Sequence, residues 1–435
     1  MGRFSSSVAA FVPRSTFARS VALMSSATGL GQALAILAAP ILTRLYSPDD
    51  FGLLGVYASI LGIVSVIASL RYEQAVPLPG SDKAAINVLA LAIAVVGATS
   101  LVVATGVFFY GPKIVSIAGA PEFGRILWWL PVGVALVGTY QALSFWAVRK
   151  QSYGRIAKTT LLQAGGSVSS QLGLGFFGAG APGLIIGQVV GQSAGISSFA
   201  TLVRAEPMTT RKAISFRRLK RVALRYRRFP LLFTWSALLN NVGLMGPTIV
   251  LAGYYGAAVV GWYTLVQRVL GMPTSLLGRS VTNVYFSESA RLAREAPDEL
   301  ATLFRKLLKK LTLLGCVTIL PAGLLSPWAF PLIFGKEWLN AGTYAMVLSP
   351  AFLLQFISSP FGVTLAVLER QDLALFREVV RVVLVAAALV LAYIGQFSPE
   401  QAIMSLAFAV GLSYLLHLYI SWLAISQEVK KSGVS

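Results

Sequence analysis

The sequence predicts an all-α integral membrane protein with about twelve transmembrane helices in two six-helix lobes around a central cavity. Hydrophobic residues make up 56% of the 435-residue chain and charged residues only 12%, whereas a soluble domain carries about 25% charged residues. Apolar segments of about 20 residues, the length that crosses a bilayer as a helix, recur along the chain. We therefore expect no sizeable soluble domain.

Twelve apolar segments mark the expected helices in chain order. The fifth and sixth are the most polar, because they are rich in Gly, Ser and Gln. In the sixth, Gly183, Gly187, Gly191 and Gly195 recur at every fourth position, a pattern typical of closely packed helices. The segments are residues 21–43, 52–70, 84–110, 126–148, 156–178, 183–202, 230–253, 260–286, 311–334, 344–368, 373–394 and 401–421.

The basic residues that give the chain its net charge of +20 are distributed unevenly between even-numbered and odd-numbered loops. The even-numbered loops and the two chain ends hold most of the Lys and Arg residues, including Arg3 and Arg14. This asymmetry predicts that the N- and C-termini are both cytoplasmic, by the positive-inside rule. It also explains the basic composition without nucleic acid, which we do not expect as a partner. The odd-numbered loops hold only Arg44, Lys113, Arg125 and Lys336.

A basic stretch at residues 204–228 divides the chain into an N-terminal lobe, residues 1–203, and a C-terminal lobe, residues 229–435. Its interspersed apolar residues indicate an amphipathic helix on the anionic inner leaflet. We favour a topology determinant and linker over a site that recruits an anionic lipid or a cytoplasmic partner. Residues 42–52 can be laid over 251–261, which predicts lobes related by a pseudo-two-fold axis along the membrane normal.

The segment 260–286 is expected to form one spanning helix with two arginines, Arg268 and Arg279. Eleven residues turn a helix about three times plus about 20°, so both arginines should share one face. Thr264 and Ser275 lie near that face by the same count. We interpret it as a polar, cationic stripe that faces a wet cavity; the alternative is that the arginines reach opposite membrane surfaces.

Other polar residues allow both a functional and a structural interpretation. Asp49 and Asp50 are candidates for an enzymatic site, but we favour a structural role, in which Ser47 caps the next helix and the two aspartates complement its dipole. His417 is a candidate proton carrier, and we favour a hydrogen bond to a neighbouring helix. Glu73 is a candidate gate or a solvated charge at a helix end. We find no spacing typical of a metal site or a P-loop and expect neither cofactor nor catalytic residue.

Two pairs of motifs resemble the O-antigen and exopolysaccharide flippases (Wzx type). Residues 44–52 and 70–79 are similar to their first helix pair, and residues 227–231 and 260–273 to their seventh and eighth helices. The resemblance implies a two-lobe bundle of the multidrug/oligosaccharidyl-lipid/polysaccharide exporter superfamily in the bacterial inner membrane. It implies translocation of an undecaprenyl-diphosphate-linked oligosaccharide (an O-antigen, exopolysaccharide or capsule repeat unit) from the cytoplasmic to the periplasmic leaflet.

The related lipid II flippases have an arginine before a proline in the eighth helix. Arg268 before Pro273 matches it, so the resemblance implies that Arg268 contacts a diphosphate. The relatives also have an Arg-Asp pair in the first helix, where residues 36–40 are apolar here, and acids for sodium, where Asn240 and Asn241 stand here. These departures put sodium coupling in doubt.

The predicted function is therefore a flippase for a lipid-linked oligosaccharide that works by alternating access. The expected partners are this substrate, membrane lipids, a polysaccharide polymerase and a chain-length regulator. The alternatives are an exporter of small cationic drugs, which should show buried acids, and a polymerase or ligase, which should show a large outer loop. The candidate substrate-binding residues are Arg268, Arg279, Thr264, Ser275, Gln32, Asn240, Asn241, Arg44 and Arg71, with Glu73 as the gate candidate.

Overall fold

The computed structural model describes residues 16–118 and 123–432, and every regular element in these ranges is a helix. This confirms the expected all-α fold class. Arg3 and Arg14, which entered the prediction of topology, lie outside the described residues. The chain divides into two compact units. The first comprises Met1–Ala38, Leu61–Pro112 and Gly124–Leu239, and the second comprises Ala39–Ile60, Lys113–Phe123 and Asn240–Ser435.

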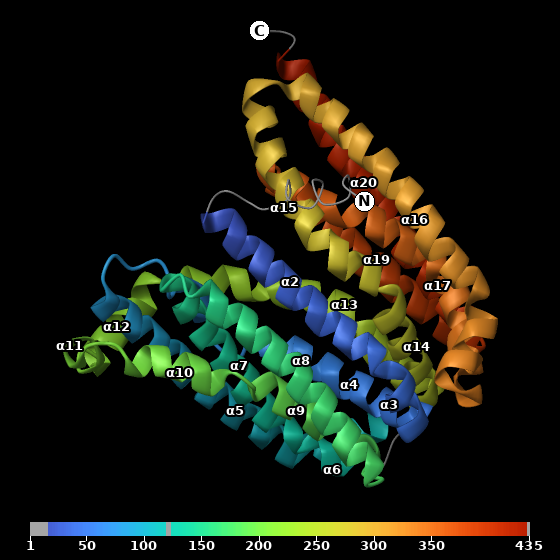
Figure 1. The fold of residues 1–435 in the computed structure, drawn as a ribbon, viewed down its shortest axis with the longest axis horizontal. Coiled ribbons are helices and arrows are strands. Elements are labelled where there is room, and N and C mark those ends of the chain that lie inside the picture. Colours follow the sequence, from blue (N-terminus) through green and yellow to red (C-terminus); the bar gives the residue numbers. More distant parts are fainter. Residues whose placement is uncertain (1–15, 119–122, 433–435) are drawn as a thin grey trace, which may run out of the picture. The chain divides into compact units, whose positions relative to one another are not determined.

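The first unit is built from a bundle of long helices and the short helices of the basic linker (Figure 1). Within it α8 packs against both α2 and α9, and α7 packs against α9 and α10. Its helices are α2 (Thr16–Leu37), most of α5 (Asp82–Ala118), α7 (Trp129–Arg149), α8 (Tyr153–Phe176), α9 (Gly180–Ser193), α10 (Ile196–Arg204), α11 (Met208–Arg211) and α12 (Phe216–Arg225), with the 3₁₀ turn η1 (Tyr72–Ala75).

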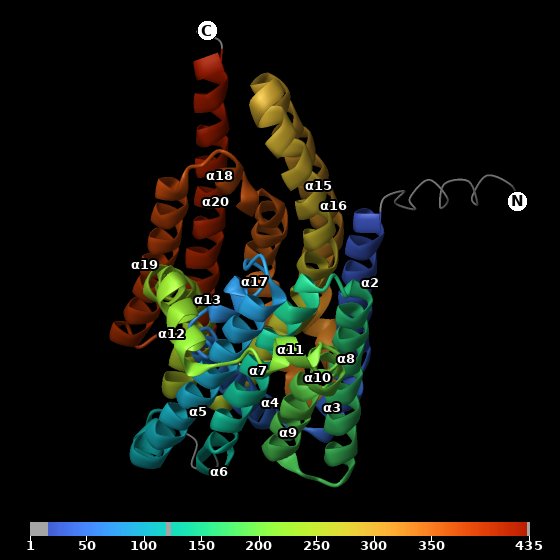
Figure 2. The same ribbon diagram turned by 90° about the vertical axis from the view of Figure 1, so that its left-hand side faces the viewer.

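The second unit holds the C-terminal helices together with the segment that follows α2. Helix α17 packs against α16, α14 and α20. Helix α19 packs against α20 (Figure 2). The elements are α3 (Ala39–Leu45), most of α4 (Pro48–Ser65), most of α13 (Thr234–Tyr255), α14 (Ala257–Leu270), α15 (Met272–Glu295), α16 (Pro297–Phe334), η3 (Lys336–Trp338), α17 (Leu339–Ser358), η4 (Ser359–Val363), α18 (Thr364–Val367), α19 (Gln371–Ile394) and α20 (Pro399–Ser432). Helix α6 (Phe123–Leu127) belongs to the first unit except for Phe123. The π-helical turn η2 (Phe229–Phe233) precedes α13.

Seven stretches of the described chain are helical, long and apolar enough to cross a membrane. The other predicted segments are helical as well. Two of them are interrupted: α9 and α10 meet at Gly195, whose φ is 99°, and α14 and α15 meet at Gly271. The seven stretches are Leu23–Leu45, Asp82–Lys113, Trp129–Arg149, Ala237–Tyr255, Pro297–Phe334, Lys336–Val367 and Pro399–Lys430.

The glycines of α9 allow it to pack closely on α8, as the sequence predicts. A Cβ at Gly187 would lie 2.5 Å from the side chain of Gln171, and one at Gly191 would lie 2.8 Å from the carbonyl oxygen of Gln163. Gln163 uses this proximity to donate a 3.0 Å hydrogen bond from Nε2 to the carbonyl oxygen of Gln192. The glycine stripe is therefore a packing surface in the first unit.

The basic linker folds into separate short helices and docks on the first unit. Asn87 of α5 donates to the carbonyl oxygen of Ala213 at 3.1 Å and accepts from the backbone N–H of Ser215 at 3.3 Å. The hydroxyl of Tyr72 donates to the carbonyl oxygen of Ala223 in α12 at 3.3 Å. The linker thus contains two helices, α11 and α12, instead of the one expected, because the chain turns between them.

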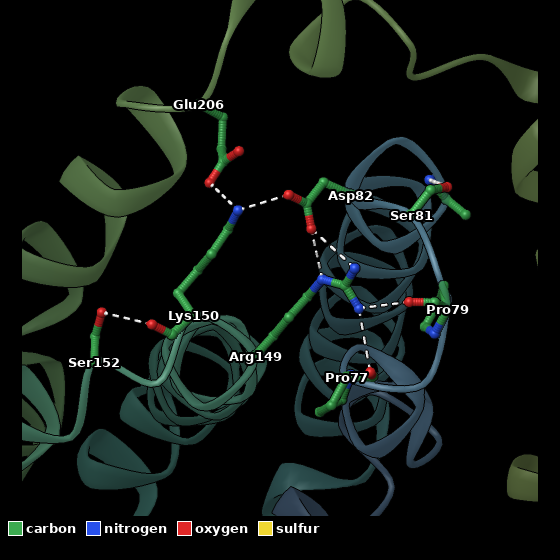
Figure 3. A network of polar contacts seen from close by, with 9 residues as sticks. Pro77, Pro79, Ser81, Asp82, Arg149, Lys150, Ser152 and Glu206 are labelled. Carbon is green, nitrogen blue, oxygen red and sulfur yellow. Dashed lines mark hydrogen bonds and ion pairs between the residues drawn. The ribbon is translucent and has the colours of Figure 1, made fainter. Parts of the chain in front are cut away.

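A network of charges connects the start of α5 with the end of α7 and with the linker (Figure 3). Lys150 lies 2.8 Å from Asp82 and 2.7 Å from Glu206. Arg149 pairs with Asp82 at 2.9 Å and donates to the carbonyl oxygens of Pro77 and Pro79 at 3.1 and 2.7 Å. Burial lowers the pKa of Lys150, but the two carboxylates outweigh burial and leave this pKa raised. The network fixes the loop before α5.

Helices α4 and α14 of the second unit cross with backbone against backbone. A Cβ at Gly52 would lie 1.9 Å from the carbonyl oxygen of Ala257, and one at Gly261 would lie 1.8 Å from that of Pro48. The predicted repeat aligns Gly52 with Gly261 in sequence, and the same alignment pairs Pro48 with Ala257. The two contacts are therefore equivalent, as a local two-fold axis requires.

Two further features hold the segment Ala39–Ile60 within the second unit. The capping box that the sequence favours at the start of α4 is present: Ser47 and Asp50 exchange bonds of 2.9 Å (Ser47 N–H to Asp50 Oδ2) and 3.2 Å (Asp50 N–H to Ser47 Oγ). The buried Trp338 donates from Nε1 to the carbonyl oxygen of Thr43 at 3.1 Å, and its ring packs edge-on against Phe51 with centroids 5.0 Å apart.

We predict that Gly52→Ala and Gly261→Ala each lower the melting temperature and the yield of folded protein. The added methyl group has to separate two helix backbones, and overpacking of this kind costs about 1–3 kcal/mol or more. Gly97→Ala is the matched control, because nothing lies within 4 Å of a Cβ at Gly97 in α5. Thermal unfolding of the purified proteins measures the effect. Equal melting temperatures for Gly52→Ala and Gly97→Ala would contradict the crossing.

Candidate functional site

Beyond its first turn, helix α19 carries three charged residues, Arg377, Glu378 and Arg381, in an otherwise apolar stretch. Arg381 is ten residues into the helix, about 15 Å from its start at about 1.5 Å per residue. All three side chains are less than a quarter exposed, at 18%, 22% and 16%. A charged residue at membrane depth costs about 2.5–3.5 kcal/mol and usually pairs with another polar group.

The three charges form a connected cluster. Glu378 accepts a 2.7 Å hydrogen bond from Arg377 and lies 2.5 Å from Nη2 of Arg381. The second contact is an ion pair without hydrogen-bond alignment. Arg377 also lies 3.1 Å from Nε2 of His417 on α20, and Arg381 donates to Oδ1 of Asn240 on α13 at 2.6 Å. The carboxylate of Glu378 is therefore the counter-ion of two guanidinium groups.

The cluster lines a polar cavity of about 170 Å³ in the second unit. A second, more apolar cavity of about 350 Å³ shares Gln355, Arg381 and Tyr414 with it. Hydroxyl and amide groups make up most of the remaining polar wall. The first cavity is lined by Thr274, Gln355, Ser358, Ser359, Gly362, Arg377, Glu378, Arg381, Ser413, Tyr414 and His417.

The expected single helix over 260–286 is a wrong prediction. Helix α14 ends at Leu270 and α15 begins at Met272, with Gly271 between them. The physical reason is Pro273, which has no N–H to continue the helix and lies two residues after Gly271. The angular count that placed Arg268 and Arg279 on one face therefore does not hold across the junction. The side chain of Arg279 lies outside the described part of the structure.

Arg268 remains a candidate on its own geometry. It lies in the last turn of α14 and is partly buried. Within the described ranges it has no hydrogen-bond or ion-pair partner. The neighbouring Gln267 and Tyr263 line the larger cavity, whereas Arg268 does not. Its predicted contact with a diphosphate stays a prediction.

The structure gives several other candidates of the second unit local roles. Thr264 packs against Gly55 at the crossing of α4 and α14. The hydroxyl of Ser275 donates to the carbonyl oxygen of Met272 at 2.8 Å. The exposed Arg44 donates to the carbonyl oxygen of Pro40 at 2.9 Å. Of these candidates Asn240 is bonded to the cluster, while its neighbour Asn241 is partly buried.

The remaining candidates lie in the first unit. Gln32 on α2 is partly buried, and its Oε1 has no partner among the described residues. Glu73 is 2% exposed, accepts from the hydroxyl of Ser69 and lies 3.8 Å from Arg71. Arg71 has a left-handed backbone with a φ of 62°. The interpretation of Glu73 as a solvated charge is therefore wrong, and the gate role stays a prediction.

The sequence analysis did not predict Arg377, Glu378 and Arg381 as site residues. The signal was present in an apolar helix, because Arg381 lies four residues after Arg377 and three after Glu378, and both spacings bring side chains together. His417 was expected to bond a neighbouring helix, and its contact with Arg377 confirms this. Its position in the cavity wall was not foreseen, because it depends on how α19 and α20 pack.

The long apolar helices define the class: a multi-pass, all-helical membrane protein. The fold agrees. The chain is similar to an inward-facing multidrug resistance transporter of the MATE family and the MOP superfamily, with a TM-score of 0.74, 14% identity and coverage of 92% of this chain and 96% of the other. It is also similar to the lipid II flippase MurJ in an inward closed conformation, with a TM-score of 0.70, 12% identity and coverage of 93% and 90%.

The chain belongs to the polysaccharide biosynthesis protein family, whose profile matches residues 41–343. The lipopolysaccharide biosynthesis protein WzxC of Escherichia coli (strain K12) is 28% identical over 43% of this chain and 36% of its own length. The succinoglycan biosynthesis transport protein ExoT of Rhizobium meliloti (strain 1021) is 23% identical over 71% of this chain and 60% of its own. The matches thus span between about a third and three fifths of these relatives' lengths.

We predict that Glu73 makes stability depend on pH. Burial raises the pKa of its carboxyl group above 4.5, against the opposing effects of the Ser69 hydroxyl, the backbone and Arg71. Glu73 therefore contributes to the stability of the folded protein below pH 4.5, and this contribution is lost as the pH rises through the raised pKa. The melting temperature of the wild type should therefore fall between about pH 5 and about pH 8 more than that of Glu73→Gln.

The exposed Glu299→Gln serves as the control for this comparison, because its carboxyl group lies in solvent at the start of α16. Melting curves recorded in the same detergent at both pH values provide the measurement. If the melting temperature of Glu73→Gln fell with pH as much as that of the wild type, Glu73 would not be the group that causes the pH dependence.

Proposed function

We propose that this protein is a flippase that moves an undecaprenyl-diphosphate-linked oligosaccharide from the cytoplasmic to the periplasmic leaflet of the bacterial inner membrane. The membership in the polysaccharide biosynthesis family supports the substrate class. The transporter fold supports translocation by alternating access rather than catalysis. A polysaccharide polymerase and a chain-length regulator are the proposed partners that receive the translocated unit.

The observation that carries this proposal is the sign of the buried charge. The cavity of the second unit is lined by two arginines and one glutamate. Guanidinium groups bind phosphate through paired hydrogen bonds and favour anions. An exporter of cationic drugs, the alternative on the same fold, would need an excess of buried acids. The charge therefore favours a substrate that carries phosphate.

Arg268 is the proposed diphosphate contact outside this cavity. It is partly buried and has no partner in the described part of the chain, so its guanidinium group is available to a ligand. With an anionic substrate, outward movement is assisted by the membrane potential, which supplies about 2.3 kcal/mol per charge per 100 mV.

We predict that Arg268→Ala lowers export at least about tenfold, because a hydrogen bond to a charged group contributes about 1.5–3 kcal/mol. Arg268→Lys should keep part of the function, because lysine retains the charge without the paired donors. Surface display of glycan in a deletion strain that expresses each variant measures this, with protein abundance from the membrane fraction.

Arg291→Ala is the matched control, because Arg291 lies exposed on α15 and its ion pairs among the described residues are with Glu288 and Glu295 of its own helix. Full surface display by Arg268→Ala at normal abundance would end the substrate-contact hypothesis. A loss of abundance without a loss of display per molecule would assign Arg268 to stability instead.

We also propose that both termini and the linker are cytoplasmic. An alkaline phosphatase reporter should be inactive when fused after residue 215 in the linker, and active when fused after Gly256, between α13 and α14. Each fusion is the control for the other, because both carry the same reporter and their expression can be compared. Activity at residue 215 would reverse the proposed orientation.

A further inference from the structure

The cavity of the second unit has an uncompensated positive charge. Arg377 and Arg381 supply two positive charges, and Glu378 is the one acid among the described residues that line it. The adjoining larger cavity adds no charged residue other than the shared Arg381. An unbalanced charge in an apolar surrounding is costly, so the cavity favours a bound anion.

Unused hydrogen-bond donors indicate the chemistry of that anion. Nε of Arg381 and the hydroxyl of Thr274 are buried and have no partner within the described chain. Nη2 of Arg381 is divided between Asn240 and Glu378. A ligand in this cavity must therefore accept several hydrogen bonds at once, as the oxygens of a phosphate group do.

Glu378 occupies the position that such an oxyanion would take. Its carboxylate lies between the two guanidinium groups, 2.7 Å from Arg377 and 2.5 Å from Arg381. The contact with Arg381 lacks hydrogen-bond alignment, so Arg381 is held less firmly by Glu378 than by Asn240, to which it donates at 2.6 Å. Glu378 thus serves as an internal counter-ion that a better acceptor can displace.

We propose that this cavity binds a phosphate-type oxyanion through Arg377 and Arg381, and that the ligand competes with Glu378 for both guanidinium groups. This inference rests on the proposed function, and it names the phosphate part of the lipid-linked substrate as the group that is bound. Asn240 holds Arg381 in place when Glu378 leaves. His417 supports Arg377 in the same way from α20.

The test measures binding to the full-length protein in nanodiscs. The probes are inorganic diphosphate, farnesyl diphosphate and farnesol, with calorimetry as the readout. We expect both diphosphates to bind and farnesol not to bind. Glu378→Gln should bind diphosphate several-fold more tightly, because it keeps the shape of the side chain and removes the competing charge. The double variant Arg377→Gln/Arg381→Gln should lose about tenfold or more in affinity.

Arg291→Gln is the charge-matched control and should bind like the wild type, because Arg291 is exposed and outside the cavity. Thr274→Val provides a variant that leaves the charges in place, and it should weaken binding by removing one unused donor. Melting curves establish that each variant is folded.

Tighter binding of farnesyl diphosphate than of inorganic diphosphate identifies the lipid-linked group as the ligand, and equal binding identifies a free oxyanion; both support the site. Unchanged affinity in the double arginine variant, or weaker binding in Glu378→Gln, overturns it. Glycan display separates this result from the proposed function. Normal export by a folded double variant that does not bind diphosphate would refute the role of this cavity and leave the flippase standing.

Discussion

The close crossing of α4 and α14 is the constraint on which the second unit depends. Gly52 and Gly261 leave no room for a side chain, so the carbonyl oxygens of Ala257 and Pro48 approach the facing backbone directly. Such approach strengthens packing between apolar helices, where burial from lipid provides little driving force. The contact also explains why Ala39–Ile60 groups with the C-terminal half of the chain, far from it in sequence.

Buried charge imposes the second constraint. The apolar surroundings of α19 tolerate Arg377 and Arg381 because Glu378, His417 and Asn240 provide partners from three helices. The partners do not balance the charge, since one carboxylate faces two guanidinium groups. This imbalance of charge is the physical basis of the proposed binding of an anion.

The break between α14 and α15 connects these two features. Helix α14 carries Gly261 at the crossing and Tyr263 and Gln267 at the larger cavity. Beyond Gly271, α15 brings Thr274 to the wall of the polar cavity. Because Pro273 prevents a straight helix, the polar residues on either side of the junction face different surroundings.

The sequence alone determined the properties that depend on local composition. The helical fold class, the positions of the apolar segments, the small-residue stripe of α9 and the cap at Ser47 follow from hydropathy, spacing and side-chain chemistry over a few residues. The repeat that aligns Gly52 with Gly261 was also visible, because both halves have a glycine where the helices cross.

Only the tertiary structure decided which charges meet. Arg381 and Asn240 are 141 positions apart, and their contact depends on how α13, α19 and α20 are rotated against one another. The same reason accounts for Glu73, which the sequence left open as a solvated charge and which the fold buries. Side-chain pairing between distant helices is set by packing, and packing has no signature in a single segment of the chain.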